Sequence, residues 1–83
     1  MVIIYGASRC GWCEKAKTLA EQYRLDYEYR SVDNEHYQRE LKTILPDVKT
    51  IPQIWWHGRH IGGYDDFAKE IEDTLNNYAQ EAC

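Results

Sequence analysis

The chain alternates between two hydrophobic periods, and each change of period marks the end of an expected element. Residues 2–5 are an apolar run that stops at Gly6, which is typical of a buried strand. Residues 25–30 alternate apolar and charged positions, which is typical of a half-exposed strand at a sheet edge. Between these strands, a helical repeat after Cys10 has its apolar positions at Ala16, Leu19, Ala20 and Tyr23. This order predicts a β-α-β unit with parallel strands.

The next segment predicts a second helix followed by a hairpin. The helix is expected to begin after Asp33 or Asn34, either of which can cap it, and to end before Pro46. Its inner face would carry Tyr37, Leu41, Ile44 and Leu45. Residues 53–56 and 59–61 are expected to form two strands joined by a tight turn at His57 and Gly58, with Gly62 and Gly63 ending the hairpin.

The chain is expected to finish with a third helix that begins at Asp65 or Asp66, one of which would cap its N-terminus. Its buried face would be Phe67, Ile71, Leu75 and Tyr78. The expected order is β-α-β-α-β-β-α, an α/β protein. Because a chain of 83 residues supports only one hydrophobic core, residues 1–83 are expected to form a single domain.

Charge and composition exclude several classes of partner. The formal charge is −4 and Lys and Arg form no cluster, so a nucleic-acid partner is not expected. The N-terminal apolar run is short and follows no basic leader, so neither a signal peptide nor a membrane span is expected. We therefore expect a cytoplasmic protein that does not bind membranes, and a monomer.

The three cysteines are an odd number in a chain with no expected export signal, which disfavours a structural disulfide framework. Cys10 and Cys13 form a Cys-x-x-Cys pair between the first strand and the first helix, where this spacing indicates redox chemistry. Cys83, at the chain end, is expected to be a free thiol outside that pair.

The start of a helix favours a reactive thiolate at Cys10. Unpaired backbone N–H groups and the positive end of the helix dipole stabilise a negative charge there, and Arg9 adds a neighbouring positive charge. Three residues of helix place Cys13 one turn further on, within bridging reach. A sulfur with a lowered pKa is also readily displaced from a mixed disulfide, as a thiol that another thiol recharges must be. We therefore expect Cys10 to attack and Cys13 to resolve.

Two other interpretations of the cysteines remain open. His57 and His60 follow the pair and could join it in a zinc site, although they lie far along the chain and on a hairpin rather than a helix. The cysteines could also be incidental. A redox pair fits the spacing and placement best, so no metal ligands are assigned.

Three motifs together resemble the glutaredoxins, in particular the short dithiol forms of bacteria and their viruses. They are Cys10-Gly11-Trp12-Cys13, Thr50-Ile51-Pro52 and the segment 62–67, and the resemblance covers nearly the whole chain. It implies a thioredoxin-like fold, a four-stranded mixed sheet flanked by three helices. It also implies a cis peptide between Ile51 and Pro52 that faces the cysteines, whereas an ordinary X-Pro bond would be trans.

The resemblance further implies a glutathione site. The Ile51 backbone would pair with the bound tripeptide, and the γ-glutamyl end would lie at the start of the last helix. The substrate-binding residues implied are Arg9, Trp12, Thr50, Ile51, Pro52, Gly63, Tyr64, Asp65 and Asp66. The chain departs from the family pattern at Asp65, where a small hydroxyl residue is common and where a carboxylate would repel the ligand's own. Alternatively, Asp65 and Asp66 serve only as helix caps.

The implied activity is that of a glutathione-dependent thiol-disulfide oxidoreductase that reduces protein disulfides and glutathione mixed disulfides, with ribonucleotide reductase as one client. Glutathione would be the reductant and no cofactor would be bound. Gly11 and Trp12 replace the Pro and Tyr frequent in the family, and a small residue at the first position accompanies iron–sulfur cluster binding in some members. The alternatives are a thioredoxin-like reductant recharged by a flavoprotein reductase and a non-catalytic iron–sulfur or zinc module.

Overall fold

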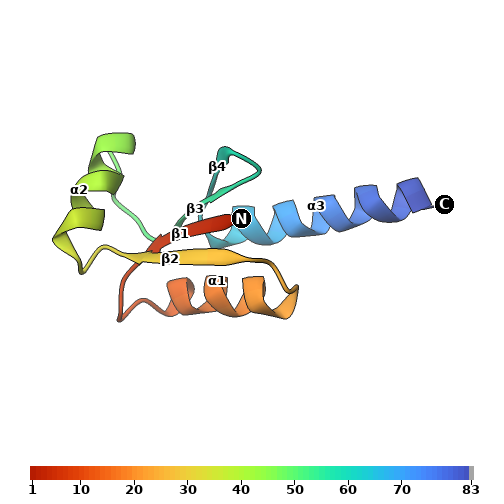
Figure 1. Cartoon of the computed structure of the whole chain (residues 1–83), viewed down its shortest axis with the longest axis horizontal. Coiled ribbons are helices and arrows are strands. Elements are labelled where there is room, and N and C mark those ends of the chain that lie inside the picture. Colours follow the sequence, from red (N-terminus) through yellow and green to blue (C-terminus); the bar gives the residue numbers. More distant parts are fainter. Residues whose placement is uncertain (83) are drawn as a thin grey trace.

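A computed structural model of the chain describes the backbone of residues 1–82 and the side chains of residues 1–75. Its elements follow the predicted order β-α-β-α-β-β-α (Figure 1). They are β1 (Val2–Gly6), α1 (Gly11–Gln22), β2 (Tyr27–Ser31), α2 (Glu35–Ile44), β3 (Gln53–Trp56), β4 (Arg59–Gly62) and α3 (Tyr64–Ala82). The expectations for Cys83 and for the side chain of Tyr78 lie outside the described residues. None of the helices in the described part is long and apolar enough to span a membrane.

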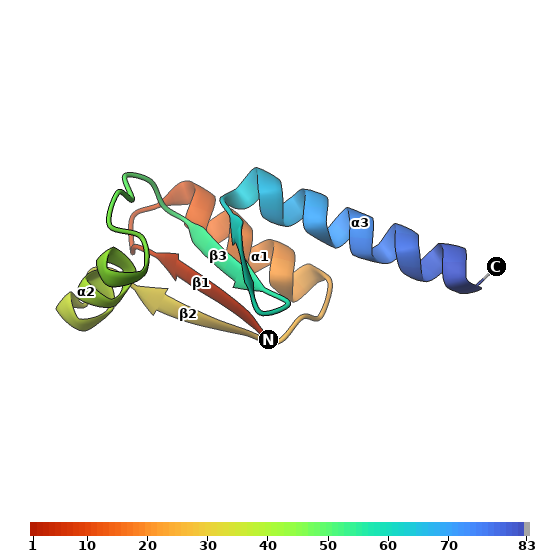
Figure 2. The same ribbon diagram turned by 90° about the horizontal axis from the view of Figure 1, so that it is seen from above.

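The four strands form one mixed sheet in the order β2-β1-β3-β4 (Figure 2). β1 runs parallel to β2, which lies at the edge as predicted, and antiparallel to β3. β3 and β4 form the predicted hairpin, whose turn residues His57 and Gly58 have φ of 57° and 73°. The pairing of Tyr5 with Gln53 places the end of β1 beside the start of β3. Loops far apart in the sequence therefore meet at this end of the sheet.

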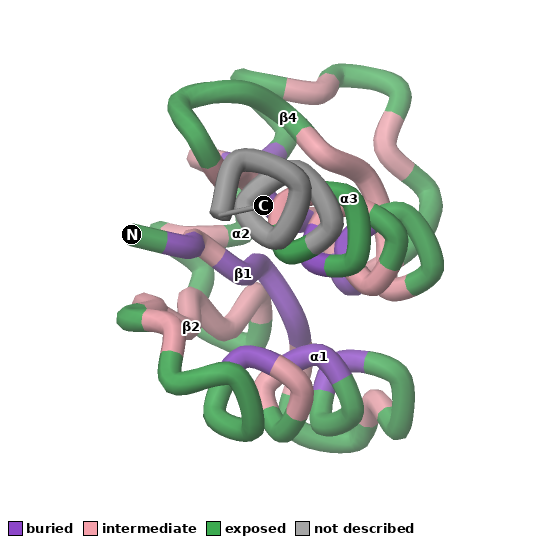
Figure 3. Tube along the Cα trace, turned by 90° about the vertical axis from the view of Figure 1, so that its right-hand side faces the viewer, coloured by how far each residue is buried: buried purple, intermediate pink, exposed green. Residues whose placement is uncertain are grey.

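The hydrophobic core lies between one face of the sheet and the helices α1 and α3 (Figure 3). Successive residues of a strand point to opposite faces of the sheet, so every second residue faces this core. The core residues are Val2, Ile4, Ala16, Ala20, Ile54, Phe67 and Ile71, and each has at most 3% of its surface exposed. The two core residues of α1, Ala16 and Ala20, have small side chains, so this helix can lie close to the sheet.

A polar network joins α2 to the opposite face of the sheet. Arg30 on β2 donates from Nη1 to Glu40 Oε1 at 2.6 Å and to the Tyr5 hydroxyl at 2.7 Å, and that hydroxyl donates to Glu40. Hydrogen bonding from Tyr5, supported by the charge of Arg30, lowers the pKa of Glu40. Glu40 therefore stays ionised under ordinary conditions and ties α2 to β1 and β2.

Helix boundaries agree with the predictions in α2 but not in α3. Asn34 is the cap of α2 and its side chain accepts from the His36 N–H at 2.9 Å, while the helix ends before Pro46 as expected. α3 begins at Tyr64, so the prediction that Asp65 or Asp66 caps it is wrong, and both lie inside its first turn. The glycine pair allows this earlier start, because the Gly63 carbonyl accepts the first helical N–H bond, from Phe67, at 3.0 Å.

Three apolar side chains assigned to buried helix faces are exposed instead. The exposed fractions are 42% for Tyr23, 48% for Ile44 and 47% for Leu75. Tyr23 follows the last residue of α1 as its C-cap, and Ile44 is the last residue of α2, so both lie where the helix leaves its partner. α3 has 19 residues, which is about 28 Å of helix at 1.5 Å per residue, whereas the neighbouring strand β4 has only four residues. The helix is therefore longer than the sheet, and Leu75 lies on the part that extends past the strands.

Gly6 is the point where β1 passes Cys13, and it leaves no room for a side chain. A Cβ at Gly6 would lie nearest to the Tyr29 hydroxyl, and 2.8 Å from Cys13 Sγ and 2.9 Å from Cys13 Cβ. We expect Gly6→Ala to cost about 1–3 kcal/mol of unfolding free energy through overpacking, measured by urea titration. Gly11→Ala is the matched control, because a Cβ there meets no atom of the described structure within 4 Å. Equal stability of the two variants would contradict the close approach.

Candidate functional site

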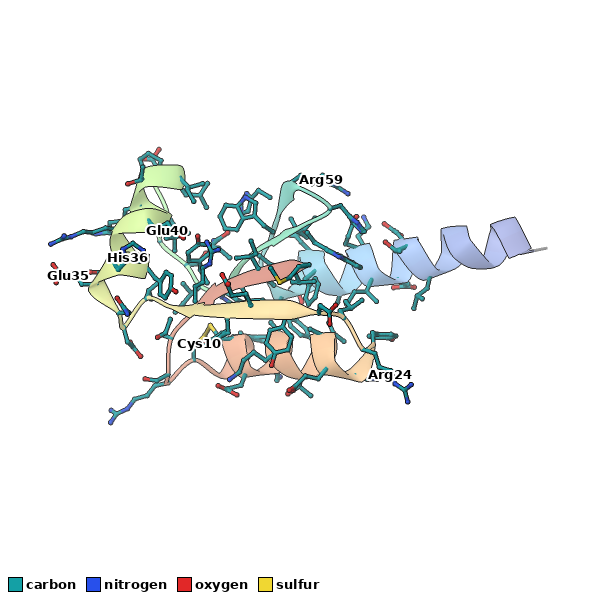
Figure 4. All side chains as sticks on the ribbon, viewed as in Figure 1. Cys10, Arg24, Glu35, His36, Glu40 and Arg59 are labelled. Carbon is teal, nitrogen blue, oxygen red and sulfur yellow. A yellow bond between two sulfur atoms is a disulfide. The ribbon has the colours of Figure 1, made fainter. Side chains whose placement is uncertain are left out.

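Cys10 and Cys13 lie at the N-terminus of α1 and are joined as a disulfide, with their Cα atoms 5.2 Å apart (Figure 4). Cys10 is the N-cap, with φ −109° and ψ 110°, and Cys13 lies in the first turn. The Cys13 N–H donates to Cys10 Sγ at 3.2 Å. The first sulfur therefore occupies the position where a helix N-terminus offers unpaired N–H groups to an anion.

The two cysteines differ sharply in access. Cys13 is fully buried beneath the end of β1, whereas Cys10 is half-buried at the surface. The buried sulfur can meet Cys10 but not a large substrate. The geometry thus separates an accessible sulfur, Cys10, from an inaccessible one, Cys13.

The loop that carries Cys10 is held by two bonds from the β2 side. Asp33 Oδ2 accepts from the Ser8 N–H at 3.0 Å, and the Tyr29 hydroxyl donates to the Ala7 carbonyl at 2.9 Å. Hydrogen bonding from Ser8, with a smaller contribution from Ser31, lowers the pKa of Asp33. The sequence suggested Asp33 only as a possible helix cap and gave no such role to Tyr29, because both contacts depend on the alignment of β1 with β2.

The peptide between Ile51 and Pro52 is cis, as the family resemblance implied. Pro52 is buried, and the Ile51 carbonyl oxygen lies 4.0 Å from Cys10 Sγ. A backbone carbonyl next to the accessible sulfur is placed to accept from the N–H of an extended peptide attached there.

A groove of about 250 Å³ runs from this loop to the start of α3. Its walls are Trp12, Thr50, Ile51, Pro52, Gly63, Tyr64, Asp65 and Asp66. These are the substrate-binding residues implied by the resemblance, except Arg9, which lies on the exposed loop before Cys10 and does not line the groove. Trp12 is half exposed, and its ring lies 5.4 Å from that of Tyr64. The structure thus gathers three distant segments around one surface.

A second groove of about 290 Å³ lies on the α2 side of the same loop and was not found from the sequence. It shares Thr50 and Ile51 with the first groove. Its other walls are Val32, Gln38, Leu41, Lys42, Val48 and Lys49. The sequence feature that could have indicated this groove is the pair Lys42 and Lys49, two cations shortly before Pro52 in a chain of net charge −4.

His57 and His60, on the hairpin, contact other side chains and not the cysteines. His57 Nε2 is 3.8 Å from Glu70, and His60 Nε2 is 2.8 Å from Gln53 Oε1. Within the residues that the structure describes, no group of three or more His, Cys, Asp or Glu is arranged to hold a metal ion.

Comparison with known proteins places these features in a family. A glutaredoxin family model matches residues 2–61. The chain belongs to the glutaredoxin family. It is 39% identical to glutaredoxin 1 of Escherichia coli K12 over 84 aligned positions, covering 89% of this chain and 95% of that protein. It is 37% identical to a glutaredoxin of Vibrio cholerae, covering 89% of this chain and 93% of that one.

Solved glutaredoxin structures share the fold. Reduced E. coli glutaredoxin superposes with a TM-score of 0.74 at 34% identity, covering 90% of this chain and 96% of that one. A buckwheat glutaredoxin–glutathione complex has a TM-score of 0.72 at 25% identity, covering 88% of this chain and 69% of that one. The thioredoxin-like α/β fold is therefore confirmed, and the chain is a thiol-disulfide oxidoreductase of the glutaredoxin type.

The bond between Asp33 and the cysteine loop predicts a pH-dependent stability. The folded pKa of Asp33 is lowered, so its stabilising effect is present above the unfolded pKa of about 3.9 and is lost as pH falls through the folded value. We expect wild type to be more stable than Asp33→Asn at pH 6, and the difference to shrink below about pH 4. Urea titrations from pH 3 to 6 measure it, with Asp47→Asn as the control for net charge. A difference that does not change with pH would contradict the assignment.

Proposed function

We propose that this chain is a glutathione-dependent thiol-disulfide oxidoreductase in which Cys10 attacks and Cys13 resolves. The main support is the position of Cys10, which caps α1 with its sulfur 4.0 Å from the carbonyl of Ile51, a wall of both grooves, while Cys13 lies buried one turn behind it. In the reduced protein, the Cys13 N–H and the helix dipole would favour the thiolate form of Cys10.

The first step is the attack of the Cys10 thiolate on a substrate disulfide. A new bond forms between Cys10 Sγ and one substrate sulfur, the substrate's own S–S bond breaks, and the other sulfur leaves as a thiolate. One substrate sulfur is then joined to Cys10 in a mixed disulfide, and the other is a free thiolate. An extended substrate would lie against the Ile51 carbonyl, 4.0 Å from the reacting sulfur.

The second step is the attack of Cys13 on Cys10. It releases the remaining substrate sulfur as a thiolate and leaves the Cys10–Cys13 disulfide, so two electrons have passed to the substrate. Two glutathione molecules would restore the dithiol. The first opens the disulfide and is held on Cys10, and the second removes the first as oxidised glutathione.

The two grooves would together hold a glutathionyl group. Its γ-glutamyl end would lie between Trp12, Tyr64 and the start of α3, and its glycine carboxylate would lie toward Lys42 and Lys49 in the second groove. A buckwheat relative was solved as a glutathione complex, which supports glutathione as the ligand.

Protein disulfides would be the other substrates, with ribonucleotide reductase as one client implied by the family resemblance. Such a cycle needs a compartment in which glutathione is mostly reduced, as in the cytoplasm. Glutathione, and no bound cofactor, would supply the electrons.

Single cysteine variants test the division of roles. In a glutathione-coupled assay on a small glutathione mixed disulfide, Cys10→Ser should lose activity and Cys13→Ser should keep it, because that reaction needs only the attacking sulfur. On a protein disulfide, both variants should lose activity. Equal loss in Cys13→Ser on both substrates would contradict the proposed roles. Turnover with a flavoprotein thioredoxin reductase but not with glutathione would indicate a thioredoxin-like reductant instead.

The two acidic residues of the first groove should act in opposite directions on glutathione binding. Asp65→Asn should lower KM for the mixed disulfide about two- to fivefold by removing repulsion of the γ-glutamyl carboxylate. Asp66→Asn should raise KM, because this carboxylate would face the ligand's amino group. Both effects should weaken at high salt. Changes in the same direction for both variants would mean that the residues act only on the helix.

A further inference from the structure

The side chain of Gln53 contacts the loop before the cis proline. Its Nε2 donates to the Thr50 carbonyl at 3.0 Å and lies 3.1 Å from the Thr50 hydroxyl. Gln53 is the first residue of β3, directly after Pro52, so this contact closes the loop back on the strand. Thr50 is also a wall of both grooves.

The other end of the Gln53 amide contacts β4. His60 Nε2 lies 2.8 Å from Gln53 Oε1. Because the amide nitrogen is directed at two oxygens of Thr50, its oxygen must face His60, and His60 Nε2 must then carry the proton that is donated. The contact thus specifies both the orientation of the amide and the tautomer of the ring.

His60 is itself held by an aromatic neighbour. Its ring lies 4.6 Å from that of Trp55, tilted by 34°, and the two residues are paired across the β3–β4 ladder. Ile54 enters the core, so Gln53 and Trp55 on either side of it point to the opposite face of the sheet. The contacts therefore run along a face that neither α1 nor α3 covers.

We propose that Gln53 and His60 are positioning residues for substrate binding, acting through Thr50 and Ile51. This inference rests on the proposed function, because it concerns the loop on which the glutathionyl group would lie. Neither residue lines the groove that reaches the start of α3, so neither would touch the ligand there. By holding the Thr50 carbonyl, they set the direction of the next residue's backbone, whose carbonyl oxygen lies 4.0 Å from Cys10 Sγ.

This role makes a specific kinetic prediction. Gln53→Met keeps the volume but removes both hydrogen-bonding ends, and should raise KM for a glutathione mixed disulfide about three- to tenfold, as expected for one or two lost hydrogen bonds. The kcat should change less than twofold, because Cys10 remains at the N-cap of α1. His60→Leu should raise KM by a smaller factor, and His60→Gln, which can again donate from Nε2, should restore it.

The double variant distinguishes positioning from general damage. If His60 acts through Gln53, Gln53→Met combined with His60→Leu should raise KM no more than Gln53→Met alone. The rate of Cys10 alkylation should be the same in all variants. The proposal would be overturned if the KM effects of the two single variants multiplied in the double variant, if His60→Gln did not restore KM, or if kcat fell by as large a factor as KM rose.

A measurement on the resting protein separates this inference from the proposed function. The backbone amide of Ile51 should show a changed NMR chemical shift and a lower order parameter in Gln53→Met and His60→Leu, but not in His60→Gln. These changes need no substrate. If they occur while the wild type fails to reduce glutathione mixed disulfides, the loop assignment holds and the proposed function is wrong. An unchanged Ile51 amide in both variants would overturn the loop assignment itself.

Discussion

The hydrogen bond from the Cys13 N–H to Cys10 Sγ is the contact on which the site is built. It exists because α1 begins at Gly11, which makes Cys10 the cap, and Ala16 and Ala20 pack this helix into the core. The start of α1 therefore decides which sulfur receives the helix N–H groups, and core packing holds that helix in place. The same packing buries Cys13 under Gly6, so one arrangement sets both the anion-binding position of the first sulfur and the inaccessibility of the second.

Sheet topology supplies the remainder of the site. The antiparallel pairing of β1 with β3 sets Tyr5 opposite Gln53, which brings the residues before β3 beside the loop that leaves β1. The pairing of Ile54 with Gly62 then brings the start of α3 to the same end. Three segments that are far apart in the sequence thus line one groove. A shift in the β1–β3 register would separate the carbonyl of Ile51 from Cys10, and a shift in the β3–β4 register would move the start of α3 away from both, however well each element formed.

Local patterns in the sequence were enough to predict the order of elements and the Cys10–Cys13 pair, because periodicity and helix placement are properties of neighbouring residues. The resemblance supplied the cis peptide at Pro52. The exposure of Ile44 and Leu75 could not be predicted, because it depends on how far a helix extends past the strands that cover it. The groove beside Lys49 and the bond between Gln53 and His60 were missed for a related reason. Each joins residues whose proximity is set by strand register and loop direction rather than by their spacing in the chain.

The opposite charges of the two grooves would determine which way round a glutathionyl group binds. Asp65 and Asp66 make the groove at α3 acidic, Lys42 and Lys49 make the groove at α2 basic, and the Thr50–Ile51 backbone separates them. A glutathionyl group carries an amino group only at its γ-glutamyl end, and its glycine end carries a carboxylate alone. The end with the cation would therefore lie against α3 and the purely anionic end against the lysines, because the reverse orientation would place like charges together at both ends. In the proposed orientation, the only ligand charge next to a like charge would be the carboxylate beside the γ-glutamyl amino group, and Asp65 would be the residue that repels it.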